Sequence, residues 1–255
     1  MSFEIIDFHT HPFISSDDNF NQHKDVLNMT SETTYLDMKD AGISKFCGSV
    51  IKTNVVDFSV IKNCNRDALK LRELYNGDYI PGFQISPNFI EESIEEIDYA
   101  HECGINLIGE LVPYMHNWSD YSSEEFSVLL DHIEKYDMVV NLHTLDLGQM
   151  ETMAKKHPHI NFVFAHPGEK AQVLNHIDVM KRNDNAFLDI SGTGIIRYGV
   201  IKKLVSEVGA ERILFGTDYP LGNLHVYVNG VLGEKISDNE KEQILSLNAK
   251  KLLKF

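Results

Sequence analysis

Two histidines at the end of the first apolar run of the chain, His9 and His11, have a spacing suited to metal binding. The run around them is expected to form a strand, in which alternate side chains lie on the same face. Two imidazoles on one face of a strand can bind a single metal ion. An H-x-H pair also occurs by chance, so the prediction depends on residues that follow later apolar runs.

Four further ionisable residues end later apolar runs, where a purely structural strand would more often place a turn residue. These residues are Glu110, His143, His166 and Asp218. For each one alone, helix capping or packing is a sufficient explanation. Four histidines and two carboxylates at matching strand ends are best explained as metal ligands, because carboxylates buried together without an ion carry a large desolvation cost.

Short β-branched runs alternate with amphipathic segments along the whole chain. The expected strands are residues 4–9, 45–50, 79–85, 105–111, 138–143, 160–166, 186–190 and 212–218. The expected helices are residues 31–41, 63–75, 90–103, 123–136, 149–156, 169–182, 196–208 and 238–253. Eight strands alternating with eight helices predict an α/β protein with the (β/α)8 TIM-barrel fold, as one domain over residues 1–255.

A doubly wound open sheet is the main alternative architecture. Its Gly-rich fingerprint is missing, because Gly192 and Gly194 are followed by Arg197 where the third glycine of G-x-G-x-x-G would stand. In a (β/α)8 barrel, active sites lie at the carboxyl ends of the strands, which is where the six ionisable residues fall. Residues 10–30 have little periodicity and are expected to form a long loop over the barrel mouth.

Charge and composition exclude several classes of partner. The net charge of −15 argues against nucleic acid, whose phosphates require clusters of Lys and Arg. No apolar stretch approaches the length of a membrane span, so no membrane partner is expected. The sequence Met1–Glu4 lacks the basic start of a signal peptide, and the three cysteines form no metal-type spacing, which together favour a cytoplasmic location.

The pattern of motifs resembles the amidohydrolase superfamily, most closely its amidohydrolase-related metal-dependent hydrolases, over the whole chain. The resemblance rests on Asp7-Phe8-His9-Thr10-His11-Pro12, Gly109-Glu110, His143, Ala165-His166-Pro167-Gly168 and Phe215-Gly216-Thr217-Asp218-Tyr219-Pro220. It implies that His9, His11 and Asp218 bind a buried metal ion and that His143 and His166 bind a second, more exposed ion. Glu110 stands where relatives have a bridging ligand, and it implies two ions without a carbamylated lysine.

The implied activity is hydrolysis of a C–N or C–O bond, in an amide, lactone or ester of a small and anionic substrate. Metal ions lower the pKa of a bound water toward neutrality and supply hydroxide, with Asp218 as the general base. Imidazole and carboxylate ligands without thiolate suit Zn²⁺, which is the first expectation, and also Mn, Fe or Co. Two ions per chain are expected.

Residues in the loops that follow the strands are candidates for substrate contact. Tyr114, His116 and Trp118 follow the fourth strand, and Tyr219 and His225 follow the eighth. Arg197 follows the Gly192–Gly194 turn after the seventh strand, a region that binds anions in many barrels. A surface or packing role is the alternative for each.

Other histidines are assigned away from the site. His157 and His159 form a second H-x-H, but they precede the sixth strand and so belong to the opposite, structural face of the barrel. His101, His132 and His176 fall on expected helices, where solvated or packed positions are expected. His23, in the first long loop, stays unassigned.

Three alternatives to a hydrolase remain at this stage. A mononuclear metal-dependent decarboxylase shares the H-x-H and terminal aspartate motifs, and it predicts one metal ion and no use of the bridging ligand Glu110. A phosphoesterase or nuclease of a related barrel family is a second alternative, and a catalytically inactive barrel that only binds ligands is a third. Relatives are often dimeric, so a homodimer is considered, although no interface signature is present.

Overall fold

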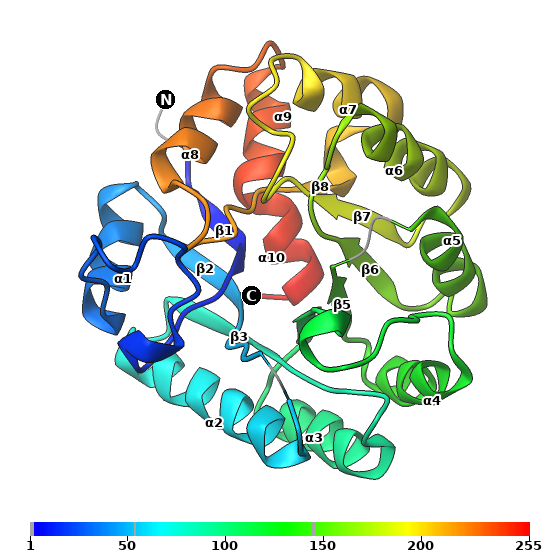
Figure 1. The fold of residues 1–255 in the computed structure, drawn as a ribbon. Helices are drawn as coiled ribbons and strands as arrows, with labels where there is room; N and C mark the ends of the chain where they lie inside the picture. The colour runs from blue at the N-terminus through cyan, green and yellow to red at the C-terminus, as the bar shows by residue number, and fades with distance from the viewer. Residues whose placement is uncertain (1–2, 54, 144–145) are drawn as a thin grey trace.

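The computed structural model describes residues 3–53, 55–143 and 146–255. Residues 1 and 2, on which part of the expectation about a signal peptide rests, lie outside the described residues. Eight described strands pair in parallel in the order of the chain, from β1 to β8. They are β1 (Ile6–Thr10), β2 (Lys45–Ser49), β3 (Tyr79–Phe83), β4 (Leu107–Leu111), β5 (Val139–Leu142), β6 (Asn161–Phe164), β7 (Ala186–Asp189) and β8 (Ile213–Leu214). Figure 1 shows these strands at the centre of the molecule with the helices around them.

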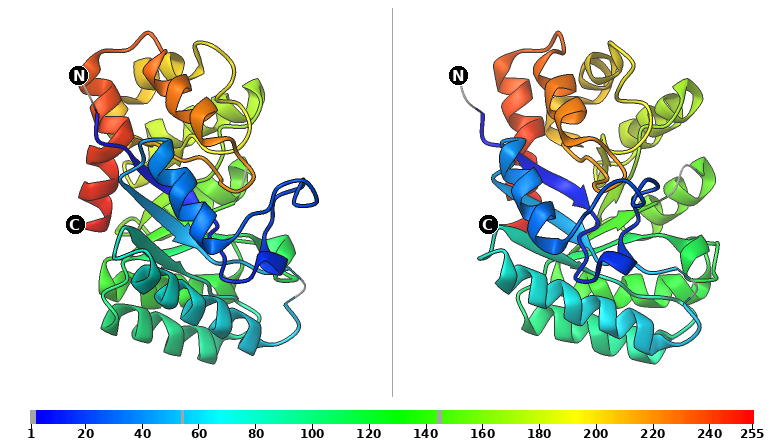
Figure 2. Two further views of the ribbon diagram at one scale, coloured as in Figure 1. Left: turned by 90° about the vertical axis from the view of Figure 1, so that its left-hand side faces the viewer. Right: turned by 60° about the vertical axis from the view of Figure 1, so that its left-hand side comes forward.

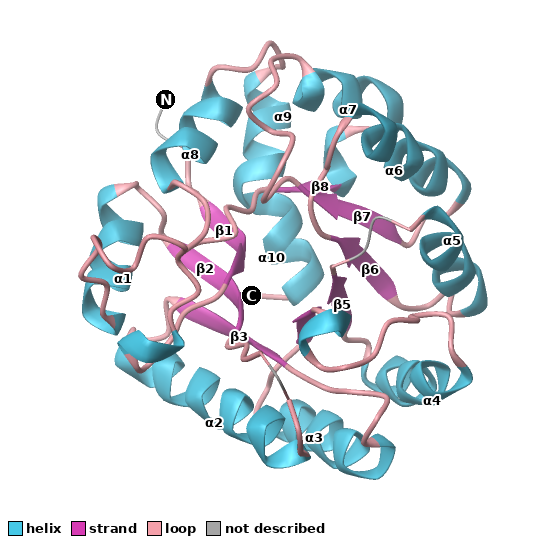
Figure 3. Cartoon of the chain, viewed as in Figure 1, coloured by secondary structure: helices cyan, strands magenta, loops and turns pink. Residues whose placement is uncertain are grey.

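The helices follow the strands in the alternation that the sequence predicts, and Figure 3 shows them outside the strands. They are α1 (Ser31–Asp40), α2 (Phe58–Leu74), α3 (Ile90–Glu102), α4 (Glu124–Ile133), α5 (Leu147–Lys156), α6 (Lys170–Arg182), α7 (Val200–Val208), α8 (Leu224–Leu232), α9 (Asp238–Glu242) and α10 (Asn248–Leu253). A π-helical turn, Gln243–Leu247, joins α9 to α10. Short 3-10 turns occur at Ser16–Asp18, Pro113–Met115, Glu134–Tyr136 and Ala210–Arg212.

Backbone hydrogen bonds join the first strand to the segment that follows the last one. Phe8 N–H donates to Phe215 O at 2.8 Å, and a parallel bridge pairs Thr10 with Tyr219. An open sheet would leave both of these edges without a partner in the sheet. The sheet is therefore a nearly closed barrel, which confirms the predicted fold over the doubly wound alternative.

The core has two layers, one inside the barrel and one between the barrel and its helices. The inner layer includes Phe8, Leu107 and Leu214, and it is completed by Leu252 and Leu253 of α10. Figure 2 shows α10 at one end of the barrel and the loop of residues 11–30 toward the other. The apolar interior and its helical cap fill one end, so polar side chains collect at the other.

Some predicted element boundaries are wrong, and each error has a local cause. Helix α8 was not predicted because its sequence, Leu224–Leu232, is rich in valine and contains a glycine, which have low helix propensity. The predicted helix 196–208 begins only at Val200, because Gly199 has φ +92°. The predicted helix 238–253 is interrupted by the π-helical turn. No described helix has the length and apolarity needed to cross a membrane.

An irregularity in β4 decides where Glu110 points. Leu107 packs inside the barrel, whereas Ile108 and Leu111 both pack in the outer layer, so strict alternation along the strand is broken between them. Without this break Glu110 would share the outward face of Ile108. The break occurs at Gly109, whose φ is +95° and whose backbone lies so close to β5 that a Cβ would approach Asn141 O to 2.2 Å.

We predict that Gly109→Ala destabilises the fold far more than Gly77→Ala. Gly77 also has a positive φ, +80°, but no atom lies within 4 Å of a Cβ added there. The Gly77→Ala variant therefore measures the cost of the backbone conformation alone. We expect a loss of about 1–2 kcal/mol for Gly77→Ala and at least about 3 kcal/mol for Gly109→Ala, where overpacking adds to that cost. Urea unfolding of both variants measures the difference. Equal losses would contradict a close contact between β4 and β5.

Candidate metal centre and active site

His9 in β1 and His11 just after it meet as the H-x-H spacing predicts. Both side chains are buried, and His9 Nε2 lies 3.2 Å from His11 Nε2. The other ring nitrogens face acceptors: His9 Nδ1 lies 2.9 Å from Asp189 Oδ2, and His11 Nδ1 lies 3.1 Å from Ser49 O. A carbonyl or a carboxylate can only accept, so both rings carry a proton on Nδ1, and Nε2 is the nitrogen that a metal ion could bind.

Glu110 lies at the centre of the cluster, with one carboxylate oxygen toward each half. Its Oε2 is 3.3 Å from His9 Nε2 and 3.2 Å from His11 Nε2. Its Oε1 is 2.9 Å from His143 Nδ1 and 3.3 Å from His166 Nε2. The structure thus brings four histidines around one buried carboxylate, as the shared strand-end positions predicted.

Electrostatic compensation keeps this buried carboxylate ionised. Burial alone would raise the pKa of Glu110, but the charge of His9 and the hydrogen bonds from His11, His143 and His166 hold it well below its usual range. Burial alone would likewise lower the pKa of His9, and the carboxylates of Asp189 and Glu110 raise it well above the ordinary value. The cluster is stable only as a balanced set of charges.

Asp218, in the loop after β8, lies on the side of the cluster formed by His9 and His11. Its Oδ1 lies 3.7 Å from His9 Nε2 and 3.5 Å from His11 Nε2. Both Asp218 and His166 have left-handed backbones, with φ of 61° and 68°. Non-glycine residues adopt this region rarely, and such positions concentrate at functional sites.

The donor atoms fit a divalent metal ion. Once the imidazoles lose their Nε2 protons, His9 Nε2, His11 Nε2, Glu110 Oε2 and Asp218 Oδ1 all offer lone pairs. The two histidine nitrogens lie 3.2 to 3.7 Å from each other and from the two carboxylate oxygens. Four ligands at about 2.0–2.2 Å in a tetrahedron are roughly 3.4 Å apart. Lone pairs that converge in this way repel one another unless a cation or protons lie between them. A second group, Glu110 Oε1 with His143 and His166, offers three donors.

A pocket of about 490 Å³ opens onto this cluster at Asp218. Its walls come from residues 21–23 of the first long loop, the turn after β7 and the segment after β8. Among the described residues that line it, Arg197 is the only lysine or arginine, and it forms an ion pair with Glu169. Both side chains of this pair are more than half exposed, so the pair contributes little stability.

The other predicted substrate residues are less close to the cluster. Tyr114 is 64% exposed, and its ring centroid lies 5.6 Å from that of His143, at the mouth of the site. His116 is buried, and no described hydrogen bond, ion pair or ring contact joins it to the six cluster residues. Trp118 packs edge-on against Tyr121 and is stacked on Phe126, so it belongs to the core.

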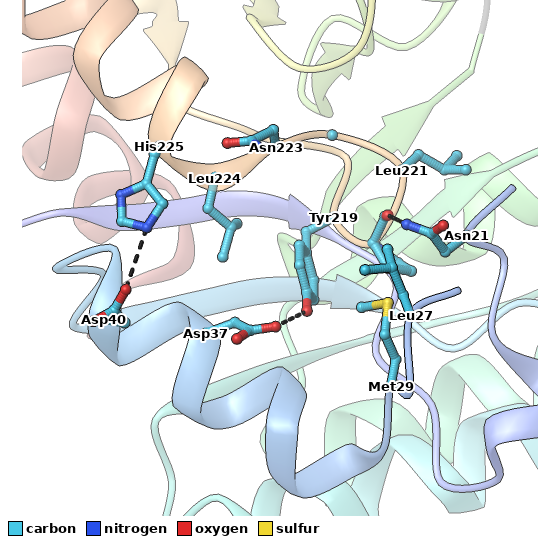
Figure 4. Close-up of a pocket in the computed structure, with 12 residues that line it drawn as sticks. Asn21, Leu27, Met29, Asp37, Asp40, Tyr219, Leu221, Asn223, Leu224 and His225 are labelled. Atoms are coloured by element: carbon cyan, nitrogen blue, oxygen red, sulfur yellow. Dashed lines mark hydrogen bonds and ion pairs between the residues drawn. The ribbon is translucent and has the colours of Figure 1, made fainter. Parts of the chain in front are cut away.

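Tyr219 and His225 line a different pocket, of about 260 Å³, between α1 and the segment after β8. Figure 4 shows both side chains pointing toward α1. Tyr219 Oη donates to Asp37 Oδ2 at 2.7 Å, and His225 Nε2 lies 3.3 Å from Asp40 Oδ2. These contacts tie the loop that bears Asp218 to the first helix, so the two residues position that loop.

The second H-x-H lies away from the cluster. His157 Nε2 is 2.9 Å from Ser127 Oγ, its Nδ1 is 3.4 Å from Asp131, and His159 is exposed. Asp131, Glu134 and His157 form a further group with the spacing of metal ligands.

The sequence did not predict the residues that contact the ligand side chains on the side away from the centre of the cluster. Asp189 and Ser191 at the end of β7 contact the rings of His9 and His166. Gln84 after β3 donates to Glu110 O at 2.5 Å. Asp189 ends an apolar run like the six predicted residues, so the same signal could have found it. Gln84 carries no such signal.

Comparison with known proteins identifies the family. A family model described as amidohydrolase matches residues 6–255. The chain belongs to the amidohydrolase family. The search of curated proteins finds no match.

Solved structures match over their whole length at low sequence identity. The 5-carboxyvanillate decarboxylase from Sphingomonas paucimobilis has a TM-score of 0.79 and 14% identity, covering 100% of both chains. An uncharacterized TIM-barrel protein from Bordetella bronchiseptica has a TM-score of 0.78 and 19% identity, covering 98% of both. A dihydroxybenzoic acid decarboxylase from a Polaromonas species, with bound manganese and an inhibitor, has a TM-score of 0.72 and 15% identity, covering 99% of this chain and 97% of that one. At this identity they show the fold.

The expectation of a hydrolase acting on a C–N or C–O bond is wrong. Several of the similar solved structures are decarboxylases, which favours the mononuclear decarboxylase that the sequence analysis left as an alternative. The ligand residues did not distinguish the two activities, because metal ions supply similar polarising charge to C–N and C–C cleavage.

We predict that Asp218→Asn and His11→Ala each reduce the content of bound divalent metal by at least one equivalent per chain, because each removes a donor from the first group. His157→Gln is the matched control, since it alters the other set of possible ligands at the opposite end. Elemental analysis after dialysis against a weak chelator measures the content. Full metal content in Asp218→Asn would contradict the assigned centre.

We predict that His116 contributes to acid unfolding. Burial lowers its pKa to about 4 from 6.5, so the unfolded chain binds a proton that the folded chain does not between these values. Stability therefore falls as the pH drops from 6.5 to 4, by up to about 3 kcal/mol at roughly 1.4 kcal/mol per unit. His116→Gln should flatten the pH dependence of the urea midpoint over this window. An unchanged slope would refute the contribution.

Proposed function

We propose that this protein is a metal-dependent decarboxylase that removes the carboxylate of a small organic acid without oxidation. The observation that supports it most is the pocket at Asp218, in which Arg197 is the one permanent cation among the described lining residues and which reaches the metal-ligand candidates at Asp218. A carboxylate substrate matches both charges. The likeness to decarboxylases over the full length of the chain supports the same reaction and suggests aromatic carboxylates as substrates.

We propose one resident divalent ion, held by His9, His11, Glu110 and Asp218, instead of the two ions expected from the sequence. This group has four protein donors, whereas the second group has three and shares Glu110 with the first. Nitrogen and oxygen donors without thiolate suit Mn²⁺ as well as Zn²⁺. When bound, the ion would supply positive charge that attracts the oxygen atoms of the substrate.

Arg197 would bind the substrate carboxylate after exchanging its partner Glu169. The exchange costs little, because both side chains of the ion pair are more than half exposed to water. A guanidinium binds a carboxylate through two parallel hydrogen bonds, which fixes the orientation as well as the position. The carboxylate would then be held at the pocket that opens onto Asp218.

Asp218 would deliver the proton that replaces the departing carboxylate. It is the one residue of the six-residue cluster that also lines the pocket, and its contacts with His9 and His11 use Oδ1, which leaves Oδ2 for a proton. In the reaction the C–C bond to the carboxylate breaks and its electron pair stays on the substrate carbon. That carbon takes the proton from Asp218, carbon dioxide leaves, and a proton from solvent restores the acid.

We predict that a panel of phenolic carboxylates releases carbon dioxide with the metal-loaded enzyme and that Arg197→Met raises KM more than it lowers kcat. Loss of a charge-assisted contact of about 1.5–3 kcal/mol corresponds to roughly 10- to 150-fold in kcat/KM. Glu169→Gln is the control, since it frees Arg197 and should leave KM unchanged or lower it. An equal KM in Arg197→Met would remove Arg197 from the site.

A different result would reject the reaction itself. If the metal-loaded enzyme releases no carbon dioxide from any member of the panel but hydrolyses amides or lactones, the proposed decarboxylase activity is wrong. Metal content should be measured on the same preparations, so that an enzyme without its ion is not scored as inactive.

A further inference from the structure

The end of β7 forms a buried contact with two imidazoles that lie on opposite halves of the ligand cluster. Ser191 Oγ is 3.1 Å from His9 Nδ1 and 3.0 Å from His166 Nδ1. Ser191 and Asp189 are both fully buried. Neither belongs to the six predicted ligand residues, and each contacts the cluster only through ring nitrogens that face away from its centre.

The hydrogen atoms in this contact can be assigned by counting donors. Asp189 Oδ2 accepts from His9 Nδ1 at 2.9 Å and from Asn141 Nδ2 at 3.1 Å. Asp189 Oδ1 accepts from the backbone N–H of Ser191 at 3.0 Å and from the Ser191 hydroxyl. Four donors therefore use the lone pairs of this carboxylate, and the single hydroxyl proton of Ser191 is committed to it.

With its proton committed, Ser191 Oγ can only accept hydrogen bonds from the two rings. A hydroxyl oxygen has two lone pairs, which match the two imidazole nitrogens. His9 and His166 must therefore both carry hydrogen on Nδ1, so in the neutral ring the lone pair of each lies on Nε2. These are the atoms that face Glu110, at 3.3 Å in both cases.

The chain after Ser191 also confines the ring of His166. A Cβ on Gly192 would lie 2.3 Å from His166 Nδ1, so the backbone after β7 lies directly against the ring edge. His176 Nε2 lies 3.1 Å from the backbone carbonyl oxygen of His166 and fixes the backbone there. The close approach of Gly192 limits the orientations of the ring, and Ser191 is the hydrogen-bond acceptor in the observed one.

We propose that Ser191 is a positioning residue that keeps His9 and His166 in the Nδ1–H tautomer, so that both Nε2 lone pairs remain available to a cation or to substrate. The proposal does not depend on which reaction the site performs. Without the hydroxyl, His9 keeps Asp189 as its acceptor, but the buried N–H of His166 loses its acceptor. The proton of His166 then moves to Nε2, where it occupies the cluster and opposes cation binding.

The test is to determine imidazole tautomers by two-bond ¹H–¹⁵N correlations in the Zn²⁺-loaded protein with ¹⁵N-labelled histidine. We expect Nδ1–H for His9 and His166 in the wild type. In Ser191→Ala we expect His166 to move to Nε2–H while His9 stays unchanged. Zn²⁺ affinity, measured by chelator competition, should fall about 10-fold or more.

Ser127→Ala is the matched control. It also removes a buried serine hydroxyl bonded to a histidine, since Ser127 Oγ lies 2.9 Å from His157 Nε2, but it does so at the opposite end of the barrel. It should change neither the tautomers of His9 and His166 nor the Zn²⁺ affinity. Ser191→Cys, which keeps a weak acceptor of similar size, should recover part of the lost affinity.

Two results would overturn the proposal. One is an Nε2–H tautomer of His166 in the wild-type protein, a measurement that needs no variant to fold. The other is a Ser191→Ala protein with the tautomers and Zn²⁺ affinity of Ser127→Ala. Failure of the decarboxylase assay would leave both readouts intact, so the two proposals can fail separately.

Discussion

Burial of the Glu110 carboxylate sets the arrangement of the charged side chains around it. A carboxylate with 3% side-chain exposure at the end of a barrel strand is tolerable only when surrounded by compensating charge. Four imidazoles provide this charge, two near each carboxylate oxygen. Asp218 adds a second carboxylate beside His9 and His11, and this extra negative charge favours a cation at the cluster. The apolar interior and α10 fill the far end of the barrel, which leaves the mouth as the place for this cluster.

Unusual backbone conformations at a few positions make this arrangement possible. The break in alternation at Gly109 turns Glu110 inward, and left-handed conformations at His166 and Asp218 direct these side chains. Behind them, Asp189 and Ser191 hold the rings, while Tyr219 ties the loop of Asp218 to α1. The ligands are therefore positioned by contacts spread over most of the strands, so a change in packing far from the cluster can alter its chemistry.

The difference between the expected and the proposed reaction rests on the likeness to solved decarboxylases and not on the ligands. A cluster of imidazoles and carboxylates supplies the same positive charge, once a metal ion is bound, for hydrolysis and for loss of carbon dioxide. Arg197, the one permanent cation among the described residues of the pocket wall, does not separate them either, because an anionic substrate of a hydrolase could also displace its exposed partner Glu169.

The barrel and the six residues of the cluster could be predicted from local patterns: alternating apolar runs, and one ionisable residue at the end of a run. The ends of β8 and the existence of α8 could not, because local propensity conflicts with packing there. The contacts of Asp189 and Ser191 with the ligand rings, and of Tyr219 and His225 with α1, appear only in the folded chain. Their roles depend on contacts between segments far apart in the chain, which no local pattern records.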